Sequence, residues 1–338
     1  MRIAIVAPPW IPVPPAGFGG IERALDGLCQ GLAADGHQVL LFATGDSTCP
    51  VETMWEFEYA VGTEMSPVME LHHVLAAYAV LQRWKPDIVH DHTLLGPFIA
   101  GDHPELAVVT TSHQPFEGSF GYLYRSLTNR VPVIAISHSQ AAMAKRPIAA
   151  VIHYGIDVSS FPIGSGQGGY GLFLGRMSLR KGVDTAIRVA RAAGIPLRIA
   201  AKMREHSERR YFAERIEPLL GGDIEYIGEA KGAAKLGLIG EAIFLLNPIA
   251  WAEPFGMVMI EALACGTPVV TRPCGAAPEI IEDGRTGFLR RDEASLARAV
   301  ENIQTIRRIN CRTVAEQRFS LQQFVTAHLA VYDKIVKG

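Results

Sequence analysis

The stretch AIFLLNPIAWAEPFGMVMIEALACGTPVVT, residues 242–271, holds an apolar run, a loop, a helical segment and a second apolar run. Ala242–Asn247 and Pro268–Thr271 are short and apolar, as buried strands are. Pro254 suits the first turn of the segment between them, because a missing N–H costs nothing at a helix start. The stretch therefore predicts a strand, a crossover helix and a parallel strand.

The same alternation extends outward over the whole chain. Further strands are expected at Ile3–Ala7, Gln38–Ala43, Asp87–His90, Ala107–Ser112, Val133–Ser137, Tyr170–Gly175, Leu197–Ala201 and Ile224–Ile227. Helical patterns are found at Ile21–Ala34, Val68–Trp84, Val183–Ala193 and Leu321–Val336. Alternation of this kind is typical of parallel sheets with crossover helices, which bind ligands at the carboxyl ends of their strands. We predict two α/β sandwiches in tandem.

Chain length agrees with two domains. The chain has 338 residues, and a domain of this kind takes about 150. The most Gly/Ser-rich stretch, residues 162–169, has the composition of a linker or hinge between domains. We expect a first domain over residues 1–158, a second over 159–318 and a final helical segment over 319–338.

The net charge of −2 hides an asymmetry between the two halves. Residues up to Val158 include 8 basic and 15 acidic side chains, whereas Ser159 onward has 24 basic and 19 acidic. Nine of the eleven histidines lie in the first half. An anionic ligand is therefore expected mainly on the second half.

Several classes of protein are disfavoured. No apolar run is long enough to cross a membrane, and the first apolar run meets Pro8 too early for a signal peptide. The five cysteines are odd in number and form no C-x-x-C pair, which favours a reducing, cytoplasmic setting. There is no basic stripe of the kind that binds nucleic acid.

Two carboxylates lie in the segment that opens this section. Glu253 precedes the predicted helix and Glu261 lies within it, while Gly256 allows close approach of the backbone to a ligand. Free N–H groups of the first turn would point at an anion, and the carboxylates could bind hydroxyls on either side of it. The alternative is that both are solvated helix carboxylates.

Arg176 ends a predicted strand, and Lys181-Gly182 opens the next helix. A planar guanidinium and a point-charge ammonium so placed suit a diphosphate. The alternative is that they only solvate a loop.

Two features of the first half of the chain are candidates for ligand binding. The loop containing Gly17-Phe18-Gly19-Gly20-Ile21-Glu22 is too long for a tight dinucleotide turn. It is either a glycine-lined lip for a ligand or a plain connection. His90, His92 and His113 follow strand ends, where they could bind hydroxyls, hold zinc if a third ligand existed, or be buried imidazoles.

Taken in order, these motifs resemble retaining glycosyltransferases of the GT-B fold, family 4 (glycosyl transferases group 1). The resemblance covers nearly the whole chain and includes the Ile136-Ser137-His138-Ser139 and Tyr154-Gly155-Ile156-Asp157 segments, together with Gly266-x-Pro268-Val-Val. It implies two Rossmann-like domains facing each other across a cleft, with a C-terminal helix that crosses back to the first domain.

The resemblance also implies roles for particular residues. The catalytic set would be His113, Arg176, Lys181 and Glu253. Donor contacts would come from Gly19, Gly20, Arg176, Lys181, Phe255, Gly256, Met257 and Glu261. The family often carries a Gly-x-Gly loop where this chain has Ala200-Ala201-Lys202-Met203, and Lys202 is expected to add a further cation to the donor pocket because it lies at a strand end. The acceptor side would include Trp10, Phe18, His90, His92 and Phe116.

The implied reaction moves a hexose from a nucleoside-diphosphate sugar, a UDP-sugar in preference to a GDP-sugar, to an acceptor hydroxyl with retention. Arg and Lys would supply the charge, so no metal or other cofactor is expected. The net-acidic first domain favours a small molecule or glycan over a membrane lipid as acceptor. A cytoplasmic enzyme is expected, with at most peripheral contact to the inner membrane face. The alternatives are a non-catalytic nucleotide-sugar binding protein and a nucleotide-sugar epimerase of the same fold.

Overall fold

A computed structural model describes residues 1–63, 65–127 and 131–338 of the chain. The chain forms two compact units. The first comprises Met1–Ile156 with Leu321–Gly338, and the second comprises Asp157–Ser320. The chain thus passes between the units at residues 156/157 and 320/321, each two residues from the position that the sequence suggested (158/159 and 318/319).

The first unit contains a seven-stranded parallel sheet in the order β3-β2-β1-β4-β5-β6-β7. Its strands are β1 (Arg2–Val6), β2 (Gln38–Ala43), β3 (Glu52–Trp55), β4 (Ile88–Asp91), β5 (Val108–Ser112), β6 (Val133–Ala135) and β7 (Ala150–Val151). Its helices are α1 (Gly20–Ala34), α2 (Pro67–Trp84), α3 (Gly96–Ile99), α4 (Gly118–Ser126), α5 (His138–Met143) and α13 (Leu321–Val336), with a 3-10 turn at Ala100–Asp102.

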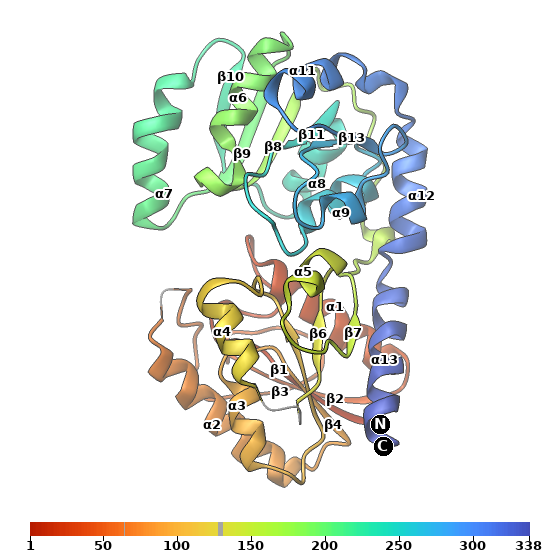
Figure 1. The fold of residues 1–338 in the computed structure, drawn as a ribbon. Helices are drawn as coiled ribbons and strands as arrows, with labels where there is room; N and C mark the ends of the chain where they lie inside the picture. Colours follow the sequence, from red (N-terminus) through yellow and green to blue (C-terminus); the bar gives the residue numbers. More distant parts are fainter. Residues whose placement is uncertain (64, 128–130) are drawn as a thin grey trace. The chain divides into compact units, whose positions relative to one another are not determined.

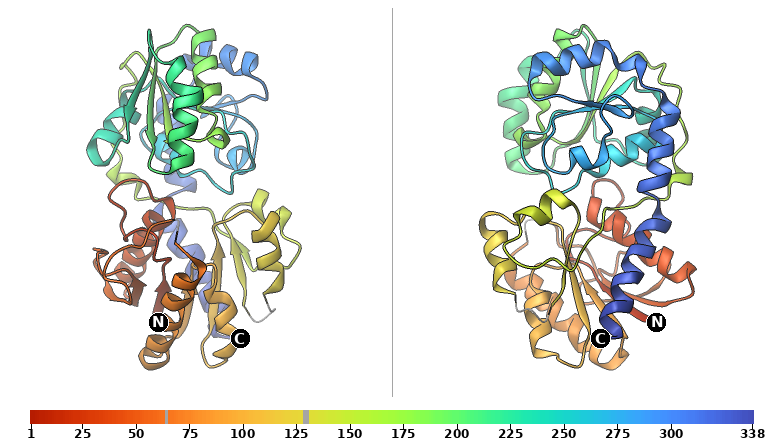
Figure 2. Two further views of the ribbon diagram at one scale, coloured as in Figure 1. Left: turned by 90° about the vertical axis from the view of Figure 1, so that its left-hand side faces the viewer. Right: turned by 45° about the vertical axis from the view of Figure 1, so that its right-hand side comes forward.

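Helix α13 belongs to the first unit although it ends the chain. It lies along α1, as Figure 1 and the right-hand view of Figure 2 show. Gly31 permits this packing, because a Cβ atom there would lie 2.4 Å from Cγ2 of Val325. The backbone N–H of Leu321 also donates to the carbonyl of Ile156 at 2.8 Å. This hydrogen bond joins Ile156, where the chain leaves the first unit, to Leu321, where it returns.

The second unit repeats this topology with six parallel strands in the order β10-β9-β8-β11-β12-β13. They are β8 (Gly171–Arg176), β9 (Leu197–Lys202), β10 (Ile224–Gly228), β11 (Phe244–Asn247), β12 (Val269–Thr271) and β13 (Gly287–Leu289). The helices are α6 (Val183–Ala192), α7 (His206–Tyr211), α8 (Gly232–Glu241), α9 (Met257–Ala264), α10 (Ala277–Ile280), α11 (Glu293–Glu301) and α12 (Arg308–Arg318). Short 3-10 turns occupy Val158–Ser160, Leu179–Lys181, Glu217–Leu219 and Ile303–Thr305, and a π turn follows α7 at Phe212–Ile216.

Two α/β units with parallel sheets confirm the predicted fold class. Each sheet reverses its strand order beside its first strand, between β1 and β4 and between β8 and β11. Such switch points are where open parallel sheets bind ligands. Among the helices of the described ranges, none is both long and apolar enough to span a bilayer.

The predicted linker at 162–169 is wrong, because this segment packs within the second unit. Its N–H groups at Gly164, Gly166 and Gly168 donate to carbonyls of Cys265, Gly240 and Glu241 at 3.0, 3.0 and 2.8 Å. A Cβ atom on Gly164 would lie 2.1 Å from the carbonyl oxygen of Gly240. Its glycine content therefore reflects close backbone packing rather than a flexible linker.

Candidate functional site

The switch point of the second sheet brings together the loops that follow β8 and β11. The N–H of Ala250 donates to the carbonyl of Arg180 at 2.9 Å, which joins these two loops. Gly182 adopts φ +75°, and a Cβ atom there would lie 2.4 Å from the carbonyl oxygen of Pro248. A glycine is needed at this position so that the loops can pack closely.

Lys181 and Glu253, 72 residues apart, meet at this switch point. The Lys181 ammonium donates to Oε1 of Glu253, and their side chains are 17% and 11% exposed. The other oxygen of Glu253, Oε2, is buried and has no hydrogen-bond partner within the described ranges. Burying an unsatisfied carboxylate oxygen is costly unless a ligand completes it.

The loop carrying Glu253 is fixed by its backbone. The N–H of Ala276 donates to the carbonyl of Glu253 at 3.0 Å. Gly275 adopts φ +58°, and a Cβ atom there would lie 2.2 Å from the carbonyl oxygen of Glu253, so a glycine is needed for this close approach. Helix α9 begins at Met257, after Gly256 at φ +116°. Placing Pro254 in the first turn was therefore wrong, because the left-handed Gly256 delays the start of the helix.

Glu261, on α9, is buried and paired with a lysine that sequence analysis missed. Lys235 Nζ on α8 donates to Glu261 Oε1 at 2.6 Å. Nothing in the spacing of these two residues marks them as partners, since they lie on separate helices.

Arg176 and Lys202 end neighbouring strands, β8 and β9, at the same level of the sheet. Lys202 is buried, and its Nζ lies 2.7 Å from Glu205 Oε1 and 3.1 Å from Glu208 Oε1. Arg176 Nε lies 3.6 Å from the same oxygen of Glu208. Glu205 and Glu208 are also residues that sequence analysis missed.

The carboxyl edge of this sheet therefore holds cations that already have carboxylate partners. Lys181, Lys202, Lys235 and Arg176 each lie within ion-pair distance of a glutamate. An anionic ligand entering here would exchange places with carboxylates rather than meet bare positive charge. At the Lys181–Glu253 pair, a phosphate would take the ammonium, while the displaced carboxylate could accept hydrogen bonds from hydroxyls.

The switch point of the first sheet is built from histidines. His92 Nδ1 lies 3.0 Å from His113 Nε2, and His113 Nδ1 is hydrogen-bonded to the Tyr154 hydroxyl. His90 bonds to Tyr332 of α13 at 2.6 Å and to Thr111 at 2.7 Å. Both ring nitrogens of His113 and of His90 are thus engaged within this unit.

Burial keeps these imidazoles neutral. It lowers the pKa of His113 to about 3 and that of His328, on α13, to about 4. The pKa values of His90 and His92 also fall well below the usual range for the same reason. A neutral imidazole suits hydroxyl groups better than phosphates, because it offers hydrogen bonds without charge.

Gly19 and Gly20 form the start of α1. Gly19, at φ +149°, is the N-cap, and a Cβ atom there would lie 2.7 Å from Cβ of Pro15. Glu22, three residues after Gly19, is buried, and desolvation raises the pKa of its carboxyl to about 7. This buried acid was not assigned a role from sequence.

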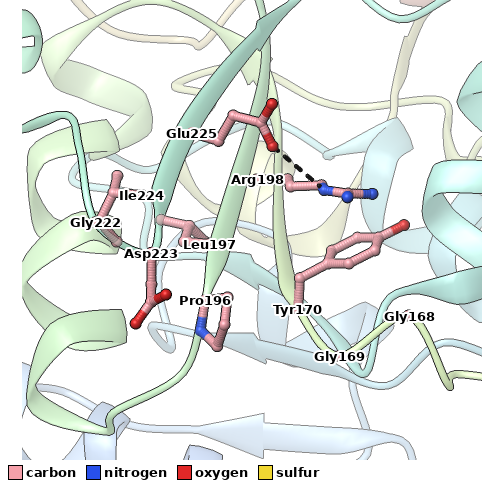
Figure 3. A pocket seen from close by; sticks show the side chains of 10 residues that line it. All are labelled: Gly168, Gly169, Tyr170, Pro196, Leu197, Arg198, Gly222, Asp223, Ile224 and Glu225. Carbon is pink, nitrogen blue, oxygen red and sulfur yellow. Dashed lines mark ion pairs between the residues drawn. The ribbon is translucent and has the colours of Figure 1, made fainter.

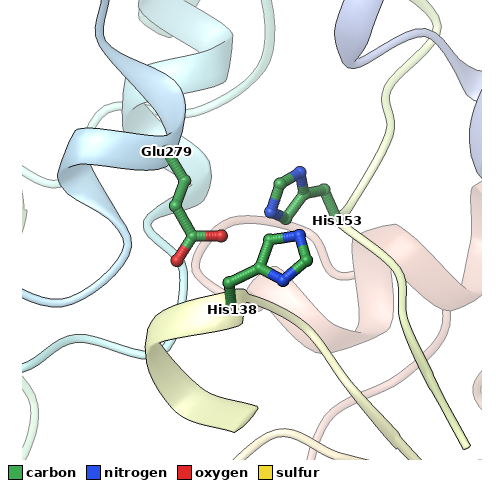
Figure 4. Close-up of side chains that lie close together, drawn as sticks. All are labelled: His138, His153 and Glu279. Atoms are coloured by element: carbon green, nitrogen blue, oxygen red, sulfur yellow. The ribbon is translucent and has the colours of Figure 1, made fainter. Parts of the chain in front are cut away.

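The expected acceptor residues divide into two groups. Trp10 and Phe18 are half-buried, whereas His90, His92 and Phe116 are buried. Phe116 packs edge-to-face on Tyr124, with ring centroids 5.2 Å apart, in a small apolar cluster. Phe116 is therefore part of the core of the first unit, and its role on the acceptor side stays a prediction. The imidazole rings of His138 and His153 also lie edge-to-face, with their centroids 5.9 Å apart (Figure 4).

Family comparisons match both units of the chain. Residues 18–160 match the family described as Glycosyltransferase Family 4, and residues 169–305 match the one described as Glycosyl transferases group 1. The chain belongs to the glycosyltransferases. It is therefore a transferase of the EC 2.4 class, which confirms that prediction.

Individual relatives span most of this glycosyltransferase. It is 28% identical to glycogen synthase from Mycobacterium tuberculosis, over 90% of this chain and 86% of that protein. It is 26% identical to phosphatidyl-myo-inositol mannosyltransferase from Mycolicibacterium smegmatis, over 86% and 80%.

Similar solved structures share the fold. Sucrose-phosphate synthase from Thermosynechococcus elongatus gives a TM-score of 0.83 at 20% identity and covers 99% of both chains. Anabaena Alr3699/HepE in complex with UDP-glucose gives 0.72 at 19% identity, covering 100% of this chain and 98% of that one. These matches confirm the expected GT-B fold.

A separate hollow lies at the opposite edge of the second sheet (Figure 3). It has a volume of about 390 Å³ and is lined by residues 168–170, which precede β8, and by residues 196–198 and 222–225, where β9 and β10 begin. The guanidinium of Arg198 lies 4.3 Å from the centre of the Tyr170 ring and pairs with Glu225 at 3.5 Å. None of the predicted donor residues lines it, and it lies away from the strand ends at which such sheets bind ligands.

Proposed function

We propose that this glycosyltransferase moves a hexose from a nucleoside-diphosphate sugar to an acceptor hydroxyl with retention of configuration. The observation that carries this proposal is the Lys181–Glu253 pair, in which a buried carboxylate oxygen lacks a partner among the described residues. A sugar diphosphate offers a partner to each side chain of this pair, since its phosphates attract Lys181 and its sugar hydroxyls can donate to Glu253.

The resemblance to the family implies the residue roles that we propose, and the ion pairs at the second switch point support those of Arg176, Lys181 and Glu253. Arg176 and Lys181 bind the diphosphate, and Glu253 with the backbone of Phe255, Gly256 and Met257 binds the sugar. Glu261 accepts hydrogen bonds from the ribose hydroxyls. For the first unit, the same resemblance implies that His113 is a sugar contact and that Gly19 and Gly20 are phosphate contacts.

The proposed reaction uses the donor's own phosphate as base. The bond from the anomeric carbon to the β-phosphate oxygen breaks, and its electron pair stays on that oxygen. The acceptor oxygen bonds to the same face of the carbon, and its proton passes to a donor phosphate oxygen. Fixed cations favour this step because charge on the diphosphate grows as the bond breaks.

We propose a uridine nucleotide as the donor carrier. The similar structure of Anabaena HepE contains UDP-glucose, which supports this choice over a guanosine nucleotide. All five cysteines of this chain are free thiols, which fits action in a reducing compartment such as the cytoplasm. We propose a small molecule or glycan as acceptor, because the first domain is net acidic.

A panel of nucleotides and nucleotide sugars tests the proposal. A ligand that binds only the folded state stabilises it by about 2.7 kcal/mol at a hundred times its Kd, so the tighter ligand gives the larger rise in melting temperature at equal concentration. UDP-sugars should therefore raise the melting temperature more than GDP-sugars. Nucleotide release from the stabilising sugar donor should then follow, unaffected by EDTA if side-chain cations supply the charge.

The alternatives give different outcomes. Binding without nucleotide release from any donor would favour a non-catalytic nucleotide-sugar binding protein. Conversion of the donor into an isomeric nucleotide sugar, without transfer, would favour an epimerase. Loss of turnover with EDTA, restored by a divalent ion, would overturn metal independence.

A further inference from the structure

Glu208 is the most enclosed carboxylate in the cluster at the ends of β8 and β9. Its residue is 2% exposed, although it lies on the short helix α7. Its two oxygens have separate tasks. Oε2 accepts from the backbone N–H groups of Arg204 and Glu205 at 2.7 and 3.1 Å, and so fixes the turn that follows β9.

Oε1 of Glu208 faces two cations. Lys202 Nζ donates to it at 3.1 Å, and Arg176 Nε lies 3.6 Å away. Glu205 adds a second carboxylate, 2.7 Å from Lys202 and 3.9 Å from Arg176 Nη1. Two cations and two carboxylates therefore form one cluster with no net charge.

Burial differs sharply between the two cations. The Lys202 side chain is 6% exposed and the Arg176 side chain is 38% exposed. Removing a buried lysine ammonium from its two carboxylates would leave charges uncompensated away from water, which is costly. Arg176 has the exposure and the planar donor set to reach a diphosphate while one edge stays against Glu208.

We propose that Glu208 is a positioning residue that holds Arg176 for the donor's diphosphate, and that Lys202 is the buried counter-ion of Glu208 rather than a diphosphate ligand. This inference rests on the proposed function and sharpens its donor site. Lys202, which replaces a glycine-containing loop of the family, thus contributes to phosphate binding only through Glu208 and Arg176.

Glu208→Gln tests the positioning role by whether it weakens or tightens the binding of pyrophosphate. The glutamine oxygen can still accept from the two backbone N–H groups, but the anion beside Arg176 is lost. Inorganic pyrophosphate, measured by calorimetry, should bind about tenfold more weakly, as expected when a charge-assisted contact no longer orients its partner. Glu214→Gln is the matched control, because it removes the same charge from an exposed site and should leave affinity within about twofold.

If Glu208 does not orient Arg176, Glu208→Gln should change pyrophosphate affinity in the opposite direction. Neutralising it would remove repulsion and tighten pyrophosphate binding. Tighter or unchanged binding by Glu208→Gln therefore overturns the positioning role.

Lys202→Met and the double variant Lys202→Met/Glu208→Gln test the counter-ion role. The single variant should lower the melting temperature by about 5 °C or more, because Glu208 loses its closest buried cation. The double variant should recover part of that loss, since neither charge remains. A lack of recovery overturns the counter-ion role, as does a loss of pyrophosphate affinity in Lys202→Met equal to that in Arg176→Met.

Arg176→Met and Lys181→Met separate this inference from the proposed function. If both bind pyrophosphate as tightly as the unaltered chain, the diphosphate site itself is misplaced. If both weaken binding while Glu208→Gln does not, the donor site stands and only the positioning role fails.

Discussion

The two switch points share one strand order but differ in their chemistry. At the first, between β1 and β4, buried imidazoles bond to one another and to tyrosine hydroxyls. At the second, between β8 and β11, lysines and an arginine pair with glutamates. The same backbone framework thus presents neutral hydrogen-bonding groups in one unit and exchangeable charges in the other.

This difference supports the ligand chemistry that we propose for each unit. A phosphate needs cations, which only the second arrangement offers in quantity. A sugar or acceptor hydroxyl needs directional partners without strong charge, and lowered pKa values provide these by keeping the histidines neutral. The charge asymmetry of the sequence therefore corresponds to a difference between sites, although much of it also lies on solvated surface.

The largest expected effect comes from removing charge at the second switch point. Lys181→Ala should lower donor turnover about 100- to 1000-fold, as loss of a group that stabilises developing charge does. The melting temperature should fall as well, because Glu253 loses its cation, and Lys231→Ala, at an exposed position, should leave turnover unaltered. Unchanged kinetics in Lys181→Ala would contradict the phosphate role and the contrast drawn between the units.

A change at the first switch point should affect the sugar and spare the nucleotide. His113→Ala should lower turnover about tenfold, the contribution of one neutral hydrogen bond. The Kd of UDP, which lacks the transferred hexose, should stay within about twofold by the same reasoning. Exposed His72→Ala is the control. A large loss of UDP affinity in His113→Ala would show that the two units do not divide the ligand in this way.

Acid should destabilise the first unit before the second. Histidines in an unfolded chain take up protons near pH 6.5, whereas burial lowers the folded pKa of His113 to about 3 and of His73 and His328 to about 4. Because the unfolded form then binds more protons, stability is present above pH 6.5 and declines as pH falls from there towards 3.

Buried carboxyls of the same unit act in the other direction. Desolvation raises the pKa of Glu22 to about 7 and of Asp91 to about 6, so their contribution is lost as pH rises through those values. Since His90 and His92 are shifted as well, we expect the imidazoles to dominate. Hydrogen-exchange mass spectrometry at pH 7.5 and 5 should show protection lost first in the first unit. Equal loss in both units would contradict this.

The smallest expected effect is that of salt. Raising ionic strength from about 0.05 to 0.5 M should weaken pyrophosphate binding about threefold, because partly exposed charges are screened. The effect is small because each cation already has a carboxylate partner. Lys181→Met should reduce this dependence, and a salt-independent affinity would argue against charge exchange at the site.

Much of the fold was predictable from the sequence, because buried parallel strands are short apolar runs. The final helix was predicted at Leu321–Val336 and is found there, and most strand ends agree within two residues. The strands β3, β7 and β13 were missed. The edge strand β3 is partly exposed and has the mixed sequence ETMW, whereas β7 and β13 have only two and three residues, too few to show a strand pattern.

The sequence by itself determined the fold class and the strand ends at which Arg176, Lys181, Glu253 and the histidines lie, because these depend on local patterns. Only the tertiary structure decided the partners of these residues. Lys235 lies on one helix and Glu261 on another, and Glu208 reaches Arg176 only after β9 pairs with β8. Ion pairs of this kind depend on side chains brought together by sheet register and helix packing, and no local pattern encodes them.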